Sequence, residues 1–354
     1  WKGWITGQTT TTLKQLDGTF KTTISAIPGW SGKDTAQRLD DIPAASLDNR
    51  LILSWSDKNL FGVPFKWATD ESNLSTNQKA FFNLKLDGTS DSNGQNRLKY
   101  VRGDRSLEGT DDPLNYTSPK IFRQRQSRQG DIVNSKIWYV STPVINYPLK
   151  GYSDFTDSQK SRSPMFYVGG NDGMLHGFSA KDGNEKLAYV PRGVLPSLGR
   201  LSDPSFNDNH KYFVDGSPMT GDIDVGTSTT PQWRTMLVGS LGAGGKGYFS
   251  LNVTNPSAFT ESNAQNLVTL DRTRHINETS PDCTIIATPA EKNTCEENND
   301  IGHIFVDPVI DESNPLRASQ ITRLNNNRWA VVMGNGYNNK NERPVLLIQY
   351  LDGA

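Results

Sequence analysis

The chain has 354 residues, of which 34% are hydrophobic, with 31 glycines, 19 prolines and a mean hydropathy of −0.60. This composition disfavours a helical enzyme and is typical of an all-β protein with short strands and long polar loops. The 37 Lys and Arg residues against 38 Asp and Glu residues exclude a global attraction to nucleic acid or to an anionic membrane. No apolar run approaches the roughly 20 residues of a spanning helix, and no secretory signal opens the sequence. If the protein is secreted, that signal has been removed or lies outside this sequence.

The first part of the sequence, residues 1–130, is the less regular one. It predicts a short helix at Thr35–Leu39 and strands at Leu51–Trp55 and Leu98–Val101. We therefore expect an irregular lead-in with one or more N-terminal blades over 1–130, followed by regular propeller blades over 131–354.

Three stretches of the second part repeat one plan. Met165–Val168 and Met174–Phe178 flank a glycine-rich turn, as do Thr235–Gly239 and Gly247–Leu251, and Trp329–Tyr350 has the same pattern. Gly, Asn and Asp supply the positive φ that tight turns need, so each stretch predicts an antiparallel hairpin. Consecutive hairpins at this spacing are typical of β-propeller blades.

Two of the turn glycines, Gly170 and Gly244, are expected at positive φ. A β-branched side chain is disfavoured in that conformation. Replacing either glycine with valine is therefore predicted to impair folding.

Long connections separate the repeats by more than the roughly 40–50 residues of a plain blade. The excess predicts insertions at 143–163, 194–213 and 254–300. Inserted loops often carry binding sites, so their aromatic residues are expected to anchor partners: Tyr147, Tyr152, Phe155 and Phe206. The fold class predicted is all-β, a β-propeller with quinoprotein-like blades and long insertions, as an incomplete portion of a seven-bladed ring.

The two cysteines, Cys283 and Cys295, lie twelve positions apart in a polar stretch without a nearby histidine. This pattern favours a disulfide in a surface insertion, which implies an oxidising compartment. The alternative is a pair of free thiols in a reducing compartment.

Oxygen-bearing side chains cluster at Asp87, Asp91 and Asn93, just before Gly94. Ca²⁺ takes six to eight hard oxygen ligands, so these three residues are calcium candidates. The spacing departs from the usual calcium loop because Thr89 stands where the first Asp belongs, and a solvated hairpin loop is the favoured alternative.

The tripeptide Arg102-Gly103-Asp104 spells an integrin-binding motif, in which an exposed loop offers a guanidinium and a carboxylate to a receptor. The alternative is that the neighbouring strand buries it. A basic run follows at Phe122–Arg128; a phosphate or glycan site is one interpretation, and a solvated loop is favoured.

Seven motifs in fixed order carry a family resemblance. They are Tyr100-Val-Arg-Gly-Asp-Arg, Phe122-Arg-Gln-Arg with Gly130-Asp-Ile-Val-Asn-Ser, Tyr167-Val-Gly-Gly-Asn-Asp-Gly-Met-Leu-His-Gly-Phe, Ala188-Tyr-Val-Pro, Phe213-Val-Asp-Gly-Ser-Pro, Gly242-Ala-Gly-Gly-Lys-Gly-Tyr-Phe and Trp329-Ala-Val-Val-Met-Gly-Asn-Gly-Tyr. Together they resemble the C-terminal propeller domain of the PilC/PilY family of type IV pilus tip proteins. The stretch from Ile301 to Tyr337 is similar to the neisserial PilC branch.

The resemblance implies a calcium-influenced virulence adhesin of the bacterial cell surface, exported through the periplasm to the pilus tip and outer membrane. It implies that the protein promotes pilus assembly and host-cell attachment, with minor pilins and a host-cell receptor as partners. In the family a calcium loop follows the Asn-Gly-Tyr motif, so the family calcium site is expected outside this chain. Within the resemblance, Arg102-Gly103-Asp104 looks like shared scaffold, with Arg102 or Asp104 in an internal ion pair.

Two other function classes remain open. Ala180–Tyr189 loosely resembles the docking repeat of quinoprotein dehydrogenases, which would make the chain a fragment of a periplasmic dehydrogenase. The four histidines are scattered and show no catalytic or metal-ligand grouping, so a non-catalytic function is favoured. The remaining class is a structural pilus cap that contacts minor pilins without binding a host ligand.

Overall fold

The computed structural model describes residues 1–109, 121–279, 281–305, 307–312 and 314–353. Its strands are β1 (Gln8–Lys14), β2 (Phe20–Ala26), β3 (Ile52–Ser56), β4 (Phe61–Pro64), β5 (Trp138–Val140), β6 (Met165–Gly169), β7 (Leu175–Ser179), β8 (Glu185–Val190), β9 (Met219–Asp224), β10 (Trp233–Ser240), β11 (Tyr248–Asn252), β12 (Val268–Asp271), β13 (Ile310–Asp311), β14 (Asn314–Ala318), β15 (Ile321–Arg323), β16 (Trp329–Gly334) and β17 (Leu346–Tyr350). Its α-helices are α1 (Thr35–Asp40), α2 (Thr76–Phe82), α3 (Gly94–Val101), α4 (Tyr152–Ser158), α5 (Leu195–Leu198), α6 (Ala264–Leu267) and α7 (Pro289–Asn299).

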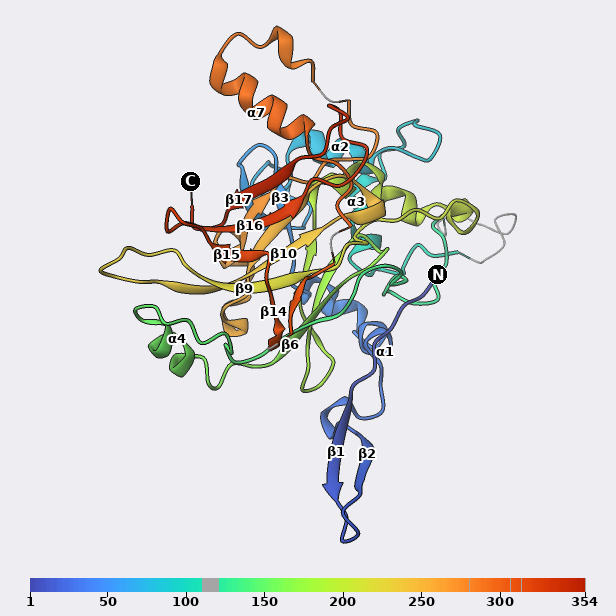
Figure 1. The fold of residues 1–354 in the computed structure, drawn as a ribbon. Helices are drawn as coiled ribbons and strands as arrows, with labels where there is room; N and C mark the ends of the chain where they lie inside the picture. The colour runs from blue at the N-terminus through green and yellow to red at the C-terminus, as the bar shows by residue number, and fades with distance from the viewer. Residues whose placement is uncertain (110–120, 280, 306, 313, 354) are drawn as a thin grey trace.

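Three sheets form the body of the molecule. Their strand orders are β4-β3-β8-β7-β6-β5, β12-β11-β10-β9 and β15-β16-β17. The β1–β2 hairpin and the helix α7 project from opposite ends of this body in Figure 1. Among the described residues the sheets do not close into a ring, and the number of blades in a complete propeller stays a prediction.

The predicted hairpins are confirmed. β6 pairs antiparallel with β7, β10 with β11, and β16 with β17. β6 and β7 are joined by a short glycine-rich turn, whereas the connections between β10 and β11 and between β16 and β17 are longer. Short helices occupy many of the connections, so the chain is mostly sheet, as expected, but is not built of strands alone.

The predicted strand at Leu98–Val101 is wrong, because these residues form the end of α3. Its buried side chains include Arg97, Leu98 and Val101, which share one face of a helix. The predicted helix near Thr35 is confirmed as α1, and Asp34 and Gln37 cap its first turn reciprocally.

The N-terminal part of the chain is built into the first sheet. β3 pairs in parallel with β8, so this sheet crosses the division expected at residue 130. On one face of the same sheet, Trp30 stacks on Phe166, with ring centroids 5.9 Å apart, and its indole Nε1 donates to the carbonyl oxygen of Ala180 at 3.0 Å. The N-terminal segment therefore covers sheet surface that would otherwise be open to water.

Side chains just before the first strands of the sheets connect the sheets to one another. Asn134, before β5, donates to the buried carboxylate of Asp215, before β9, from its backbone N at 3.1 Å and its Nδ2 at 2.6 Å. Ser217 Oγ in turn donates to Asp307, before β13, at 3.1 Å. These bonds link the segment before β5 to the segment before β9, and the segment before β9 to the one before β13.

The described helices are all too short or too polar to cross a membrane.

Candidate functional site

The integrin-like tripeptide follows α3 directly, and the structure buries its arginine. Arg102 is 3% exposed, and its guanidinium donates to the carbonyl oxygen of Phe65 at 2.9 Å and to that of Arg50 at 3.2 Å. Gly103 adopts a φ of +117°. The interpretation of Arg102 as a receptor contact is therefore wrong for this structure, because the guanidinium is buried and both of its terminal nitrogens donate to backbone carbonyl oxygens inside the protein.

Three arginines hold the backbone of the tripeptide. Arg50 Nη1 donates to the carbonyl oxygen of Arg102 at 2.6 Å, Arg128 Nε to that of Gly103 at 2.8 Å, and Arg125 Nη2 to that of Asp104 at 2.8 Å. The carboxylate of Asp104 is half-buried and accepts from the backbone N of Ser106 at 2.7 Å. Of the integrin-like pair, only the Asp104 carboxylate reaches the surface.

The basic run at 122–128 is not the solvated loop that the sequence favours. Arg123, Arg125 and Arg128 are 6%, 9% and 9% exposed. Arg125 pairs with Glu108 at 2.7 Å and lies over the ring of Tyr100, 3.7 Å from its centroid. Because most acceptors are backbone carbonyls of distant segments, no local pattern in the sequence could have revealed this role.

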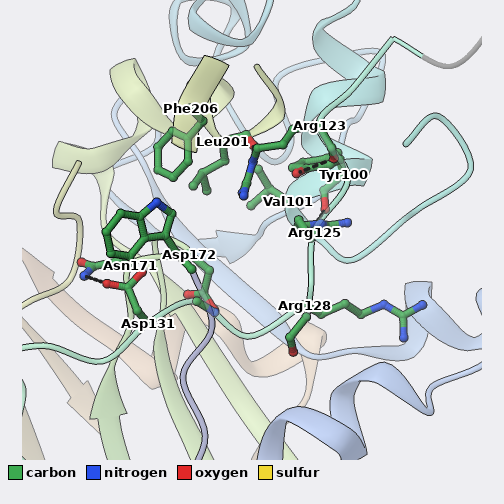
Figure 2. Close-up of a pocket in the computed structure, with 13 residues that line it drawn as sticks. Tyr100, Val101, Arg123, Arg125, Arg128, Asp131, Asn171, Asp172, Leu201 and Phe206 are labelled. Atoms are coloured by element: carbon green, nitrogen blue, oxygen red, sulfur yellow. Dashed lines mark hydrogen bonds between the residues drawn. The ribbon is translucent and has the colours of Figure 1, made fainter. Parts of the chain in front are cut away.

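A small cavity lies beside these arginines (Figure 2). It is lined by Arg125 and Asp172, among others, and Asp131 bonds Asn171 at its edge. Its volume of about 20 Å³ is enough for a single water molecule and too small for an organic ligand. The cavity is therefore part of the packing of this region and offers no ligand site.

A buried charge network continues from the cavity to the first sheet. His176 is 0% exposed; its Nδ1 lies 2.8 Å from Glu185 and its Nε2 3.0 Å from Asp172. Arg50 binds the same glutamate at 2.8 Å. Burial alone would lower the pKa of His176, but the two carboxylates outweigh it and raise that pKa to about 9.

The pKa of Glu185, the acidic partner of His176, is shifted in the opposite direction. Burial would raise the pKa of Glu185, but Arg50 and His176 lower it to about 2. The network is therefore charged at neutral pH, with each ion paired, as buried ions must be.

The carboxylates of the calcium candidates are bound to other groups of the protein. The Asp91 carboxylate is taken by a bidentate ion pair with Arg97, both distances being 2.6 Å, which lowers the pKa of Asp91 to about 2. Asp87 accepts instead from the backbone N of Thr89 at 2.8 Å. No group of three or more His, Cys, Asp or Glu residues able to hold a metal ion occurs in the described part of the chain. Asp87, Asp91 and Asn93 thus do not fit a calcium site.

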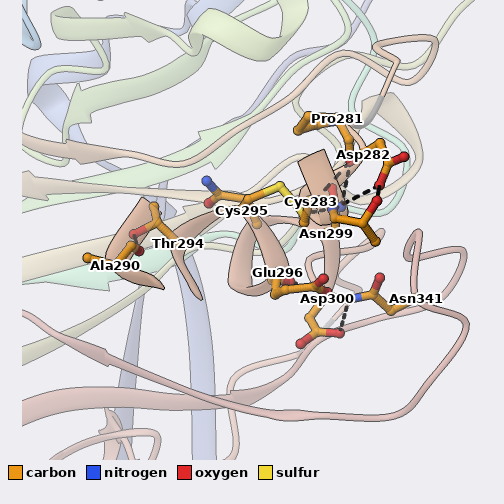
Figure 3. Close-up of a disulfide and its surroundings, with 12 residues drawn as sticks. Pro281, Asp282, Cys283, Ala290, Thr294, Cys295, Glu296, Asn299, Asp300 and Asn341 are labelled. Carbon is orange, nitrogen blue, oxygen red and sulfur yellow. Dashed lines mark hydrogen bonds between the residues drawn. A yellow bond between two sulfur atoms is a disulfide. The ribbon is translucent and has the colours of Figure 1, made fainter. Parts of the chain in front are cut away.

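A disulfide joins Cys283 to Cys295 at the base of the projecting helix α7 (Figure 3). Asn299, in the last turn of α7, donates from Nδ2 to the carbonyl oxygen of Pro281 at 3.0 Å. The next residue, Asp300, pairs with Arg343 at 2.7 Å. We call residues 281–300 the disulfide finger; the disulfide and the Asn299 bond close it at its base, and the Asp300–Arg343 pair fixes that base to the body.

The insertion aromatics face inward, which corrects the expectation that they anchor partners. Tyr152, Phe155 and Phe206 are 2%, 8% and 3% exposed, and the half-buried Tyr147 stacks on Trp233. Burying these apolar rings against the rest of the protein lowers the free energy of the folded state, so the rings are not left exposed for a partner.

Of the two turn glycines, Gly244 is required for a different reason from the one predicted, and a Cβ at Gly170 would meet no atom closer than 3.1 Å. Neither Gly170 nor Gly244 has positive φ. A Cβ at Gly244 would lie 1.8 Å from the carbonyl oxygen of Phe213, so close backbone approach, and not φ, excludes a side chain there.

Comparisons with known proteins agree with this architecture. Residues 129–281 match the family model described as the PilY1 beta-propeller domain. The chain is 32% identical, over 98% of its length, to the type IV pilus biogenesis factor PilY1 of Pseudomonas aeruginosa strain PAK. It is 36% identical, over 71% of its length, to a PilY1 homolog of Xylella fastidiosa.

These matches cover 25% and 15% of the two relatives, so the chain spans a quarter or less of their length. A crystal structure of the P. aeruginosa PilY1 C-terminal domain is also similar, with 31% identity, a TM-score of 0.37, and coverage of 60% of this chain and 34% of that one. Family model and relatives agree, and the chain belongs to the PilY1 family of type IV pilus biogenesis factors.

Proposed function

We propose that this chain is the propeller part of an exported, non-catalytic protein that promotes assembly of type IV pili and attachment to host cells from the pilus tip and outer membrane. The observation that carries the proposal is the identity of 32% across 98% of the chain to a protein named as a pilus biogenesis factor. The disulfide supports export, because such bonds persist in oxidising compartments. The relatives are named as biogenesis factors, which disfavours the dehydrogenase alternative.

The proposed partners are minor pilins at the pilus tip and a host-cell receptor. Since Arg102 is buried, we do not propose attachment to a receptor through the integrin-like tripeptide. A contact with pilus subunits is the favoured alternative. The parts that stand away from the body are the β1–β2 hairpin and the disulfide finger (Figure 1), which makes them accessible to a partner. For calcium we propose only a site outside these residues, as the family resemblance implies.

The test uses the parent protein in a strain that lacks its own copy. Wild type, a variant without 131–353, and a variant with 284–294 replaced by a short Gly-Ser linker are compared for pilin in the sheared surface fraction and for attached cells. We expect the large deletion to abolish surface pili, and the linker variant to fold and to lose attachment or pili. Normal piliation and attachment with 131–353 deleted would overturn the proposal.

A further inference from the structure

A second cavity, of about 410 Å³, lies away from the arginine-held tripeptide. Its volume falls in the range of roughly 300–1,000 Å³ that is usual for small-ligand sites. Four segments that are distant in sequence form its walls: the β3–β4 turn with Asp57, α2 with Phe81, the segment after β8 with Arg192, and the segment after β12 with His275.

The walls of this cavity are held by a buried carboxylate. Asp271 accepts from the backbone N of Arg192 at 2.9 Å, from Thr273 Oγ1 at 2.5 Å and from the hydroxyl of Tyr189 at 2.5 Å. The backbone N of Gly193 donates to Thr273 Oγ1 at 2.9 Å. The segments after β8 and β12 are therefore fixed to one another before any ligand arrives, which lowers the cost of binding.

The histidine of the cavity is neutral and does not activate its serine neighbour. Its Nδ1 accepts from the backbone N–H of Asn277 at 3.2 Å, so the ring proton is on Nε2, which donates to Ser197 Oγ at 2.6 Å. Burial, together with the nearby Arg200, lowers the pKa of His275. Because Nε2 donates, it cannot take the hydroxyl proton of Ser197, and the pair is arranged for binding and not for nucleophilic attack.

Two charged wall residues keep atoms that make no hydrogen bond to a described residue. Arg192 donates from Nε to the carbonyl oxygen of Thr273 at 3.1 Å, and the same Nε lies 3.9 Å from the buried carboxylate of Asp271. Its two terminal nitrogens make no hydrogen bond within the described part of the chain. Asp57 is exposed, and no described residue bonds its carboxylate. The third charged wall residue, Glu278, is already bound to Arg274 at 3.2 Å.

We propose that this cavity binds a zwitterionic ligand of the amino-acid class, with a carboxylate on the terminal nitrogens of Arg192 and a cationic group on Asp57. A guanidinium presents two parallel donors that match a carboxylate in geometry as well as in charge. The same chemistry exists in a free amino acid and in neighbouring acidic and basic side chains of a protein segment. Pilus assembly does not depend on this proposal.

The experiment measures binding to the purified chain by isothermal titration, with probes at up to about 1 mM, the weak end of specific affinity. One arm uses the free amino acids L-glutamate, L-lysine and L-arginine; the other uses the capped dipeptide acetyl-Lys-Glu-amide. Binding in the first arm assigns a small molecule, and binding in the second arm alone assigns a protein segment.

Substitutions of the two charged wall residues then test where in the cavity the ligand binds. R192Q and D57N are each expected to weaken binding by about tenfold or more, whereas R192K, which keeps the charge and loses the paired donors, has an intermediate effect. R323Q and D87N change exposed residues outside the cavity and are the matched controls. Failure of both arms with the wild-type chain, or binding that R192Q and D57N leave unchanged, would overturn the proposal.

Discussion

Arg128 donates a hydrogen bond from its Nε to the carbonyl oxygen of Gly103 at 2.8 Å, across 25 positions of sequence. The same guanidinium also reaches the carbonyl oxygens of Leu39 and Asp40, each at 2.7 Å from Nη1. One buried cation thus ties the end of α1, the tripeptide segment and the basic run together.

Replacing this residue should destabilise the protein. Arg128→Ala leaves several carbonyl oxygens without a donor, and we expect a loss of about 2–3 kcal/mol in the free energy of unfolding. Urea denaturation followed by tryptophan fluorescence measures it. The exposed Arg323→Ala is the control, expected within about 0.5 kcal/mol of wild type; equal stability of both variants would contradict the role of Arg128.

The His176 network should make the free energy of unfolding fall at both acidic and alkaline pH. A folded-state pKa of about 9, above the ordinary histidine value of 6.5, makes the contribution of His176 complete below pH 6.5 and lost as pH rises through 9. A folded-state pKa of about 2 for Glu185 makes its contribution complete above 4.5 and lost as pH falls towards 2. We expect the largest contribution of the pair between pH 4.5 and 6.5, with a decline on the order of 1 kcal/mol per pH unit on the alkaline side.

Denaturation midpoints at pH 2 to 10 check this dependence on both the acid and the alkaline side. The matched variant His176→Gln removes the titrating group and should lower stability at neutral pH while flattening the alkaline decline. An unchanged alkaline decline in that variant would assign the effect to other groups.

The disulfide should protect the finger locally. In the unreduced protein we expect no free thiol, since Cys283 and Cys295 are joined. In a Cys283→Ser, Cys295→Ser double variant, the base of α7 loses its covalent closure, so protease cleavage within 284–294 should accelerate while the sheets stay folded. Limited proteolysis with mass spectrometry reports this; two titratable thiols in the unreduced wild type would refute the bond.

Valine substitutions at two glycines should show whether close contact with neighbouring backbone is what excludes a side chain at Gly244. Gly244→Val places a side chain against the carbonyl oxygen of Phe213 and is expected to cost about 4 kcal/mol or more, or to prevent soluble expression. Gly334→Val, where nothing lies within 4 Å of the added Cβ, is the control and should fold. Comparable thermal midpoints for the two variants would show that the contact at Gly244 can relax.

The sequence was informative where structure is decided locally. Met165–Val168 and Met174–Phe178 are separated by Gly, Asn and Asp in a turn, and these residues alone determine that the chain reverses. Whether Asp91 binds calcium could not be predicted from the local sequence. Its carboxylate resembles a calcium ligand, and only the structure shows that Arg97 forms an ion pair with it.

The arginine contacts were beyond sequence reasoning for a related reason. Arg102 lies 37 positions from the carbonyl oxygen of Phe65 to which it donates, and Arg128 lies 89 positions from that of Leu39. Backbone carbonyls are present at every residue, so an acceptor leaves no trace in the residue types around it. An arginine in a polar stretch therefore has the same appearance whether it is solvated or buried.

The parallel pairing of β3 with β8 has a consequence for the order of folding. β3 is made early, yet its partner at 188–190 follows more than a hundred residues later along the chain. Until then β3 has only the short strand β4 beside it, and an isolated two-stranded hairpin is marginally stable in water. Contacts between distant segments form slowly because a long loop must close first. During synthesis the residues of β3 that are buried in the folded protein therefore stay exposed to water until β8 has been made.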